Sequence, residues 1–445
     1  MTRRLRRAVG CALGLVLALG PLAACDEQPD PEPEPSGDVT LSFGVFGDDT
    51  EVAAYQEAVD EFNEQAAQVQ VQLLSWPDAA AFRADLETGA RPPDIYLVAR
   101  RDLQFVIDNE LNEPLFELLE ARDLSLGDEY SQRAIEGFSA DDDLQCMPYS
   151  VSPMVIYYNK RLVDFDLMRE RGLPAPEDEL EGWTFEEFAA AATFASRPRT
   201  GARGLSISPT LRSLAPFIYS GGGQLFDDPT DPTSLAFSSD TNIDTLTTIQ
   251  TLLRDPEVTL SEEQLAEATP LQWFQRGRLG MIEGYRGITP QLRKVASLSF
   301  DVMPMPRVGG DATIGDLTGL CISPGDHVQP AADFLVNAIS PEGMAPVAEA
   351  GYIVPTNLAV ARSDAFLQPG RSPSNAGVFN AAVESIQLAP LIDDPDALNA
   401  AVEPELRELL TGSVIPDLSA LAAEIDERSR AVLDPDYEPS PEPTD

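Results

Sequence analysis

The chain of 445 residues has one histidine, His327, and two lysines. Zinc enzymes use histidine as a ligand, and serine or cysteine hydrolases use it as a base. With a single histidine, the chain has too few parts for either class. The sequence also has no G-x-S-x-G elbow, Walker A loop or G-x-G-x-x-G fingerprint. We therefore expect no catalytic residue, no metal site and no cofactor, and we interpret His327 as a surface residue.

Positive charge is scarce as well. Lysine and arginine number 30 against 74 aspartates and glutamates, which gives a formal net charge of −44. Such a surface repels phosphate backbones, so nucleic acid is excluded as a partner. With so many acids, a pair of carboxylates is expected by chance and does not indicate a glycosidase. The acidic runs at 141–143 and 227–231 fit solvated turns better than calcium sites, because they lack the EF-hand pattern.

The first 24 residues indicate export. Four arginines precede an apolar run at 8–24 that is too short for a confident membrane span, which is typical of a signal peptide. The run ends in Leu22-Ala23-Ala24-Cys25, which resembles a bacterial lipobox. We expect lipidation of Cys25 and anchoring to the outer face of the cell membrane, since two acyl chains on one residue anchor stably. The alternative is ordinary signal cleavage beside an incidental cysteine.

Both ends of the mature chain are poor in apolar residues. The segments at 25–37 and 434–445 consist largely of proline and acidic residues. Such segments cannot bury enough apolar area to fold, so we expect an extended tether and a disordered tail.

The body begins with an alternation of strands and helices. Alternating apolar residues predict strands at 39–46, 69–74 and 94–99, and helical spacing of apolar residues predicts intervening helices at 48–62 and 78–88. This order favours a parallel sheet with crossover helices, whose ligands lie at the carboxyl ends of the strands.

Further elements follow along the chain. A helix is expected at 181–195, with Thr184 as its cap and Trp183 as a hydrophobic staple. Strands are expected at 205–208, 279–283, 300–306 and 317–323, two helices at 327–350, and helices in the remaining segments to Leu433.

The folded body retains two cysteines, Cys146 and Cys321, because Cys11 leaves with the signal and Cys25 is expected to carry lipid. In an oxidising compartment a disulfide is the simplest state for such a pair. Two buried free thiols are the alternative.

Several segments together resemble the extracellular solute-binding proteins of ABC importers, the family that includes maltose-binding proteins. Each segment is weak alone, but the set occurs in order over 39–433. The matching segments are 39–62, 93–95, 146–148, 157–160, 182–188, 274–281, 300–306 and 351–356.

The resemblance implies an α/β fold of two lobes, each with a central, mostly parallel sheet flanked by helices, joined by hinge strands. It places lobe 1 at 38–148 and 319–370, and lobe 2 at 149–318 and 371–433. The segments at 147–152 and 317–323 would be antiparallel crossing strands. Cys146 and Cys321 would then lie on neighbouring strands near the hinge, which favours the disulfide.

Candidate ligand-binding residues follow from the strand ends and the family pattern. They are Asp48, Asp49, Trp76, Arg100, Arg101, Tyr149, Ser150, Ser152, Thr210, Arg212, Tyr285, Arg286 and Asp316. Tyr285, Tyr149 and Trp76 are the expected aromatic platforms for a sugar, although each is equally compatible with a packing role. The arginines depart from the family pattern and suit an acidic or phosphorylated solute, since guanidinium pairs bidentately with carboxylate and phosphate.

The resemblance implies that the protein is not an enzyme. We expect a monomer that captures a carbohydrate or related polyol between two lobes and delivers it to an ABC permease. The alternatives are an anchored glycoside hydrolase and a sensory binding protein without transport.

Overall fold

The computed structural model describes residues 39–140, 142–411 and 417–438. The predicted signal peptide, Cys25, the tether and the end of the predicted tail lie outside these ranges. No helix among the described residues combines the length and the hydropathy needed to cross a membrane.

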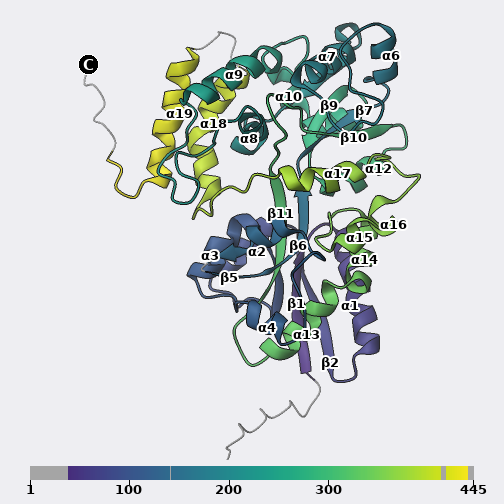
Figure 1. Cartoon of the computed structure of the whole chain (residues 1–445), viewed down its shortest axis with the longest axis vertical. Coiled ribbons are helices and arrows are strands. Elements are labelled where there is room, and N and C mark those ends of the chain that lie inside the picture. The colour runs from purple at the N-terminus through teal and green to yellow at the C-terminus, as the bar shows by residue number, and fades with distance from the viewer. Residues whose placement is uncertain (1–38, 141, 412–416, 439–445) are drawn as a thin grey trace, which may run out of the picture. The chain divides into compact units, whose positions relative to one another are not determined.

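The first sheet has five strands in the order β2-β1-β3-β11-β6 (Figure 1). Its strands are β1 (Val39–Phe46), β2 (Val69–Trp76), β3 (Ile95–Ala99), β6 (Met147–Pro153) and β11 (Gly315–Ile322). As predicted, β1 is parallel to both β2 and β3. The crossing strands β6 and β11 are antiparallel to each other, and β11 is antiparallel to β3.

The helices of the first sheet begin where the sequence supplies caps. Asp48 caps α1 by accepting hydrogen bonds from the backbone N–H groups of Thr50 and Glu51, and Asp78 caps α2 in the same way through the N–H of Ala81. The elements around this sheet are α1 (Asp49–Gln65), α2 (Ala79–Glu87), η1 (Arg100–Asp102), α3 (Leu103–Asp108), α4 (Phe116–Glu120), α5 (Gln132–Gly137), the short strands β4 (Ser139–Ala140) and β5 (Asp143–Leu144), α13 (Val328–Ala338) and α14 (Pro341–Ala350).

The second sheet has the order β10-β7-β9-β8. Its strands are β7 (Val155–Asn159), β8 (Arg203–Ser206), β9 (Leu279–Gly284) and β10 (Phe300–Pro304). Only β8 and β9 are parallel, whereas β7 is antiparallel to both of its neighbours. The expectation of mostly parallel sheets is therefore wrong in detail. The chain runs from β6 almost directly into β7, so the hinge strand enters the second sheet without a crossover helix.

The remaining helices surround the second sheet or connect it to the first. They are α6 (Phe165–Glu170), α7 (Phe185–Ala195), η2 (Pro198–Thr200), α8 (Leu211–Ser220), α9 (Asp240–Leu253), α10 (Glu262–Glu267), α11 (Pro270–Gln275), η3 (Arg286–Ile288), α12 (Thr289–Arg293), α15 (Leu358–Ala361), α16 (Asp364–Leu367), α17 (Gly377–Ala382), η4 (Val383–Ser385), α18 (Pro395–Thr411) and α19 (Leu418–Leu433). The predicted cap of α7 is present: Thr184 and Glu187 form a reciprocal capping box. The Trp183 ring also packs 5.3 Å from the Phe188 ring, as a staple does.

Separate hydrophobic cores define two lobes. One core covers the first sheet and includes Leu41, Phe43 and Tyr96. The second sheet has a core on each face, because Ile156 and Tyr158 of β7 belong to one cluster and Tyr157 to the other. We refer to the parts around the first and second sheets as the first and second lobes.

Cys146, the residue before β6, forms a disulfide with Cys321 of β11. Their Cα atoms lie 4.4 Å apart, next to the pair Met147 and Leu320 of the antiparallel strands, and both side chains are fully buried. The two cysteines are 175 positions apart in the chain, so the bond closes a long loop.

The predicted disordered tail is partly ordered. Asp434 accepts a hydrogen bond from Arg430, and the Tyr437 hydroxyl donates to Glu427. Residues 434–438 therefore turn back against the end of α19, where the Tyr437 ring centre lies 5.0 Å from the Arg430 guanidinium.

Candidate functional site

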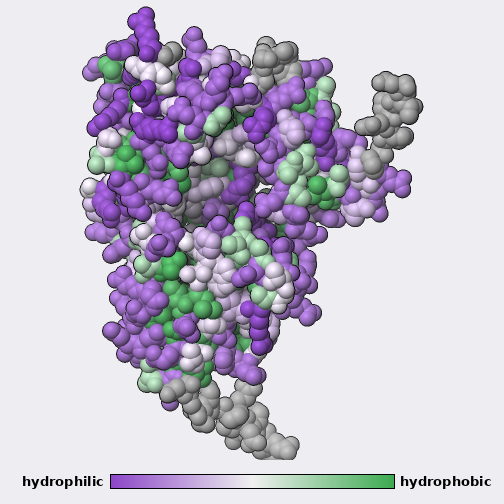
Figure 2. Space-filling model, turned by 180° about the vertical axis from the view of Figure 1, so that it is seen from behind, coloured by the Kyte–Doolittle hydropathy of each residue, from purple (hydrophilic) through white to green (hydrophobic). Residues whose placement is uncertain are grey.

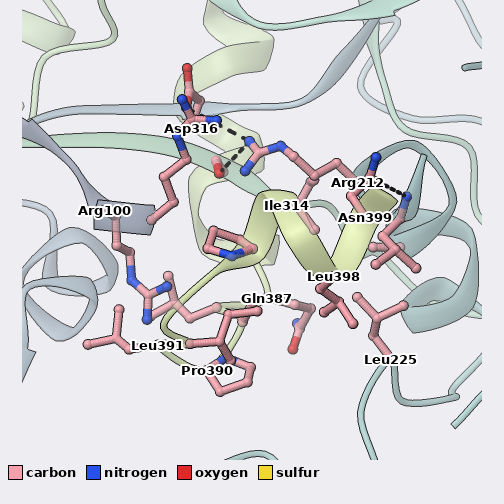
Figure 3. A pocket seen from close by; sticks show the side chains of 18 of the residues that line it. Arg100, Arg212, Leu225, Ile314, Asp316, Gln387, Pro390, Leu391, Leu398 and Asn399 are labelled. Atoms are coloured by element: carbon pink, nitrogen blue, oxygen red, sulfur yellow. Dashed lines mark hydrogen bonds and ion pairs between the residues drawn. The ribbon is translucent and has the colours of Figure 1, made fainter. Parts of the chain in front are cut away.

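A pocket of about 300 Å³ is lined by elements of both lobes (Figure 3). The first lobe contributes the end of β3 with η1, and the start of β11. The second lobe contributes the first turns of α8 and α18. The segment at 387–392 completes the wall. The pocket therefore lies at the carboxyl end of β3, the edge at which open α/β sheets bind ligands.

Five of the predicted residues meet in this pocket. They are Arg100, Arg101, Thr210, Arg212 and Asp316. Thr210 caps α8 by accepting a hydrogen bond from the N–H of Ser213, and this cap places Arg212 in the first turn of the helix.

Arg212 connects the second lobe to the hinge. Its Nη2 donates to the Tyr285 hydroxyl at 2.6 Å and to the Gly315 carbonyl at 3.2 Å, and it lies 3.8 Å from Asp316 Oδ1 (Figure 3). Burial opposes the charged form of Arg212, but Tyr285 and Asp316 raise its pKa above the usual value. Arg212 therefore stays charged and holds α8 against the start of β11.

Arg100 and Arg101 follow β3 directly. Arg100 Nε donates to the Gly137 carbonyl at 2.8 Å. Burial lowers the pKa of Arg100 to about 10, so its guanidinium is still charged at neutral pH. Arg101 lies 3.9 Å from Asp102 and 3.7 Å from Asp396. These two separations exceed hydrogen-bonding distance.

The rest of the lining is mainly apolar and was not predicted. It includes Leu211, Ala215, Leu225, Phe226, Ile314, Leu388, Ala389, Pro390, Leu391, Ile392 and Leu398. Helices were expected throughout this part of the chain, but 386–394 is irregular, because Pro390 interrupts helical backbone and Pro395 is the first residue of α18. The apolar run around Pro390 was the available signal for a loop with a buried role.

A second pocket of about 390 Å³ adjoins the first and shares Thr210 and Arg212 with it. Its walls carry the hydroxyl groups of Ser206, Ser208, Ser213 and Thr269 together with Tyr285 and Glu283. A flat aromatic ring beside several hydroxyl groups suits a ligand that itself carries hydroxyls. Tyr285, predicted as a platform, lies here.

Glu283 is the buried acid of this second pocket. Its Oε1 accepts hydrogen bonds from the Ser208 N–H at 3.0 Å and the Ser213 hydroxyl at 2.5 Å. Its Oε2 is shielded from solvent and has no partner among the described residues. Burial raises the pKa of Glu283 to about 7, because the charged form loses hydration.

Seven predicted residues line neither pocket, and three of these, Asp48, Asp49 and Trp76, are exposed or half-buried. Asp48 caps α1 and accepts hydrogen bonds from the Tyr352 hydroxyl at 2.7 and 2.8 Å. Asp49 is exposed in the first turn of α1. Trp76 donates its indole N–H to Asp85 and packs 4.7 Å from the Phe82 ring, so its role is in packing.

Four predicted residues lie in the interior. Tyr149 is 2% exposed with its ring 5.8 Å from the Tyr55 ring. These residues have little accessible surface in this structure, and ligand contact by them stays a prediction. The other three are Ser150, Ser152 and Arg286.

Their contacts support the hinge instead. Ser150 and Ser152 accept hydrogen bonds from the N–H groups of Val354 and Arg286, at 3.4 and 2.9 Å. Arg286 is fully buried, donates to the Phe366 carbonyl at 3.1 Å, and has its guanidinium 4.7 Å from the centre of the Phe366 ring.

The acidic loop at 227–231 is held by its own hydrogen bonds. No group of three or more histidine, cysteine, aspartate or glutamate residues in the described part of the chain could hold a metal ion. The Asp227 carboxylate instead accepts hydrogen bonds from the N–H groups of Thr233 and Ser234 within its own loop. His327 is half-exposed and pairs with Asp94 at 2.9 Å.

Comparison with known proteins places the chain in a well-populated structural class. Residues 57–370 match the family model described as bacterial extracellular solute-binding protein. No curated protein sequence matches the chain.

Three solved structures are similar across nearly the whole chain. An ABC substrate-binding protein from Listeria monocytogenes, in complex with cycloalternan, has a TM-score of 0.73 at 19% identity and covers 88% of this chain and 99% of its own. The GacH receptor of Streptomyces glaucescens, solved unliganded and with acarbose, has a TM-score of 0.70 at 18% identity and covers 90% of this chain and 100% of its own. Maltose-bound MalE3 of T. maritima has a TM-score of 0.68 at 15% identity and covers 89% of this chain and 100% of its own. These similarities establish the two-lobe fold of periplasmic binding proteins.

Proposed function

Because the chain belongs to the bacterial extracellular solute-binding proteins, we propose that it captures a carbohydrate or related polyol between its two lobes and delivers it to the permease of an ABC importer. The observation that carries the proposal is the pocket itself. Its walls come from both lobes, so a bound solute touches both. The family consists of binding proteins, so the mechanism contains no step that makes or breaks a bond.

Carbohydrate as the solute class has two supports. Solved structures of the same fold hold cycloalternan, acarbose and maltose. In this chain, the adjoining pocket combines the Tyr285 ring with serine and threonine hydroxyls, a combination that binds sugar rings and their hydroxyl groups.

The mechanism is hinge closure. The lobes are connected by β6 and its neighbour β11, which lines the pocket, and by the chain that precedes α18. A solute that contacts both lobes has a higher affinity for the closed state, and this difference in affinity is what shifts the population toward closure. The closed form then docks on the permease.

The position in the cell follows from the N-terminal sequence. Lipidation at Cys25 anchors the protein to the outer face of the membrane, and the acidic tether at 26–37 separates the folded body from the surface. The protein acts as a monomer. The proposed lobe boundaries at 148/149 and 318/319 fall within β6 and β11, the two crossing strands of the first sheet.

Thermal unfolding in the presence of candidate solutes tests the proposal. A solute at one hundred times its Kd should stabilise the protein by about 2.7 kcal/mol and raise Tm by several degrees. The panel contains malto-oligosaccharides, cyclic oligosaccharides, monosaccharides and polyols, each with and without charge. If no member raises Tm at millimolar concentration, the proposed function is wrong.

A further inference from the structure

Arginines are concentrated in the pocket between the lobes. The whole chain carries a net charge of −44, yet Arg100, Arg101 and Arg212 line this pocket together with only two acids, Asp316 and Asp396. The sign of the local charge is therefore opposite to that of the whole protein. A fixed excess of positive charge in a cleft attracts anions.

The guanidinium groups of Arg100 and Arg101 have donors to spare. Each guanidinium offers five N–H donors. Arg100 uses Nε for the Gly137 carbonyl, and its terminal nitrogens make no hydrogen bond to the described residues. Arg101 makes none within the described ranges either, because its nearest carboxylates lie at 3.7 and 3.9 Å. Arg212, in contrast, is already engaged with Tyr285 and Gly315.

The surroundings strengthen an interaction with an anion. Figure 3 shows the Arg100 guanidinium on the same side of the pocket as Leu391 and Pro390. Aliphatic walls exclude water and lower the local dielectric constant, which strengthens a charge-assisted hydrogen bond. Burial lowers the pKa of Arg100 and the charge of Glu136 opposes this shift, but Glu136 does not line the pocket and so does not compete with an anion there.

The pocket is also poorly equipped for a neutral sugar. No tryptophan lines it: Trp76 packs on Phe82, and Trp183 and Trp273 are buried in the second lobe. Tyr149 is buried as well, and Tyr285 lines only the adjoining pocket. The aromatic residues of these walls are the half-buried Tyr219 and the buried Phe226. Three arginines therefore face the pocket against one partly exposed aromatic ring.

We propose that the solute carries an anionic group, a carboxylate or a phosphate, which Arg100 and Arg101 bind at the end of β3. The proposal rests on the proposed function, since it assumes that this pocket holds the transported solute. Asp396, 82% exposed and 3.7 Å from Arg101, is the loose partner that the anion displaces.

Calorimetric titration of the full chain with matched pairs of sugars tests the proposal. Galactose and galacturonate, or glucose and glucuronate, differ in a carboxylate, whereas glucose and glucose 6-phosphate differ in a phosphate. At least one charged member should bind ten times more tightly than its neutral counterpart, and added salt should weaken the binding of the charged member alone. The two kinds of pair distinguish a carboxylate from a phosphate solute.

Substitutions at the site sharpen the test. Arg101→Gln should weaken binding of the charged sugar roughly 10- to 100-fold and change binding of the neutral sugar little. Arg101→Lys should have an intermediate affinity for the charged sugar, because it keeps the charge and loses the planar guanidinium. Asp396→Asn should increase the affinity for the charged sugar, since it removes a carboxylate that competes for Arg101. Arg407→Gln, at an exposed arginine of α18 outside the pocket, is the matched control.

Each outcome has one meaning. If the neutral members bind as tightly as the charged ones, or if Arg101→Gln weakens both equally, the anionic solute is wrong while the proposed function stands. If no member of any pair binds, the anionic solute is wrong, and the thermal-unfolding panel of oligosaccharides and polyols decides the proposed function separately. Arg100→Gln is a second variant of the site and should weaken binding of the charged sugar as well. Unfolding of both variants without solute shows whether the lost affinity comes from reduced stability.

Discussion

Glu283 is a buried carboxyl group whose charge the fold opposes. Its Oε1 accepts two hydrogen bonds, but its Oε2 has no partner in the described part of the chain. Burial therefore raises its pKa from 4.5 to about 7. In the folded protein the acid holds its proton at a pH at which the unfolded chain has already released it.

This raised pKa predicts a dependence of stability on pH. Below about pH 4.5 the acid is protonated in both states. Between pH 4.5 and 7 only the unfolded chain loses the proton, so the stabilisation is lost as pH rises and is gone above pH 7. Glu283→Gln removes this titration and should gain on the order of 2 kcal/mol relative to the parent between pH 5 and pH 8. Urea unfolding at each pH measures the difference.

The design isolates Glu283 from other acids. Burial raises the pKa of Glu51 to about 8, but that contribution is common to both proteins and cancels in the difference. Glu57→Gln, at an exposed glutamate of α1, controls for the loss of one negative charge. A difference between parent and Glu283→Gln that stays constant with pH would show that the carboxyl group is ionised in the folded state.

Single residues of the site were predictable to different degrees. Arg100 and Arg101 were predictable because the carboxyl end of a parallel strand is a general ligand-binding position. Tyr149 was not, because every residue of β6 is buried. Alternation along a strand separates an inner from an outer face only where one face meets solvent.

At the scale of elements, the sequence signals were clearest where a cap and an apolar face coincide. The Thr184 box and the Trp183 staple together locate the start of α7. The segment at 386–394 had neither signal, and its position depends on contacts with residues far away in the chain, which no local pattern encodes. The direction of β7 was hidden for the same reason, since it follows from how the hinge strand enters the second sheet.

The disulfide acts on the pair of crossing strands. It joins the residue before β6 to β11 within the first sheet and closes a loop over 175 positions. The double variant Cys146→Ala with Cys321→Ala should lose roughly 2–5 kcal/mol of unfolding free energy, towards the upper end because the loop is long. Solute affinity should change by less than about twofold, because neither cysteine lines the pocket. Denaturant unfolding and calorimetry measure the two quantities.

Two further measurements control this prediction. Reduction of the parent protein should reproduce the stability loss of the double variant. Intact mass after denaturing alkylation of the unreduced exported protein reports the state of the thiols directly. Two alkylated thiols would show that the cysteines are free in the native protein.

At the scale of the whole molecule, the segment at 387–392 connects the two cores. Leu388 and Leu391 pack against the core of the first lobe, whereas Ala389 and Ile392 pack against a core of the second. The segment leads into α18, which packs on α9 and α19 of the second lobe. Leu391 therefore links the second lobe to the first through apolar packing, and it also lines the pocket.

This contact predicts that Leu391 affects lobe closure before any solute binds. Leu391→Ser removes apolar contact worth about 1–2 kcal/mol and should shift the solute-free population toward open forms. The radius of gyration measured by X-ray scattering without solute should therefore increase. The apparent affinity should fall in proportion to the fraction of the binding-competent state. Leu173→Ser, at a leucine that is 40% exposed in the second lobe, is the matched control and should change neither quantity. A variant with reduced affinity and an unchanged solute-free radius would show that Leu391 contacts the solute without holding the lobes together.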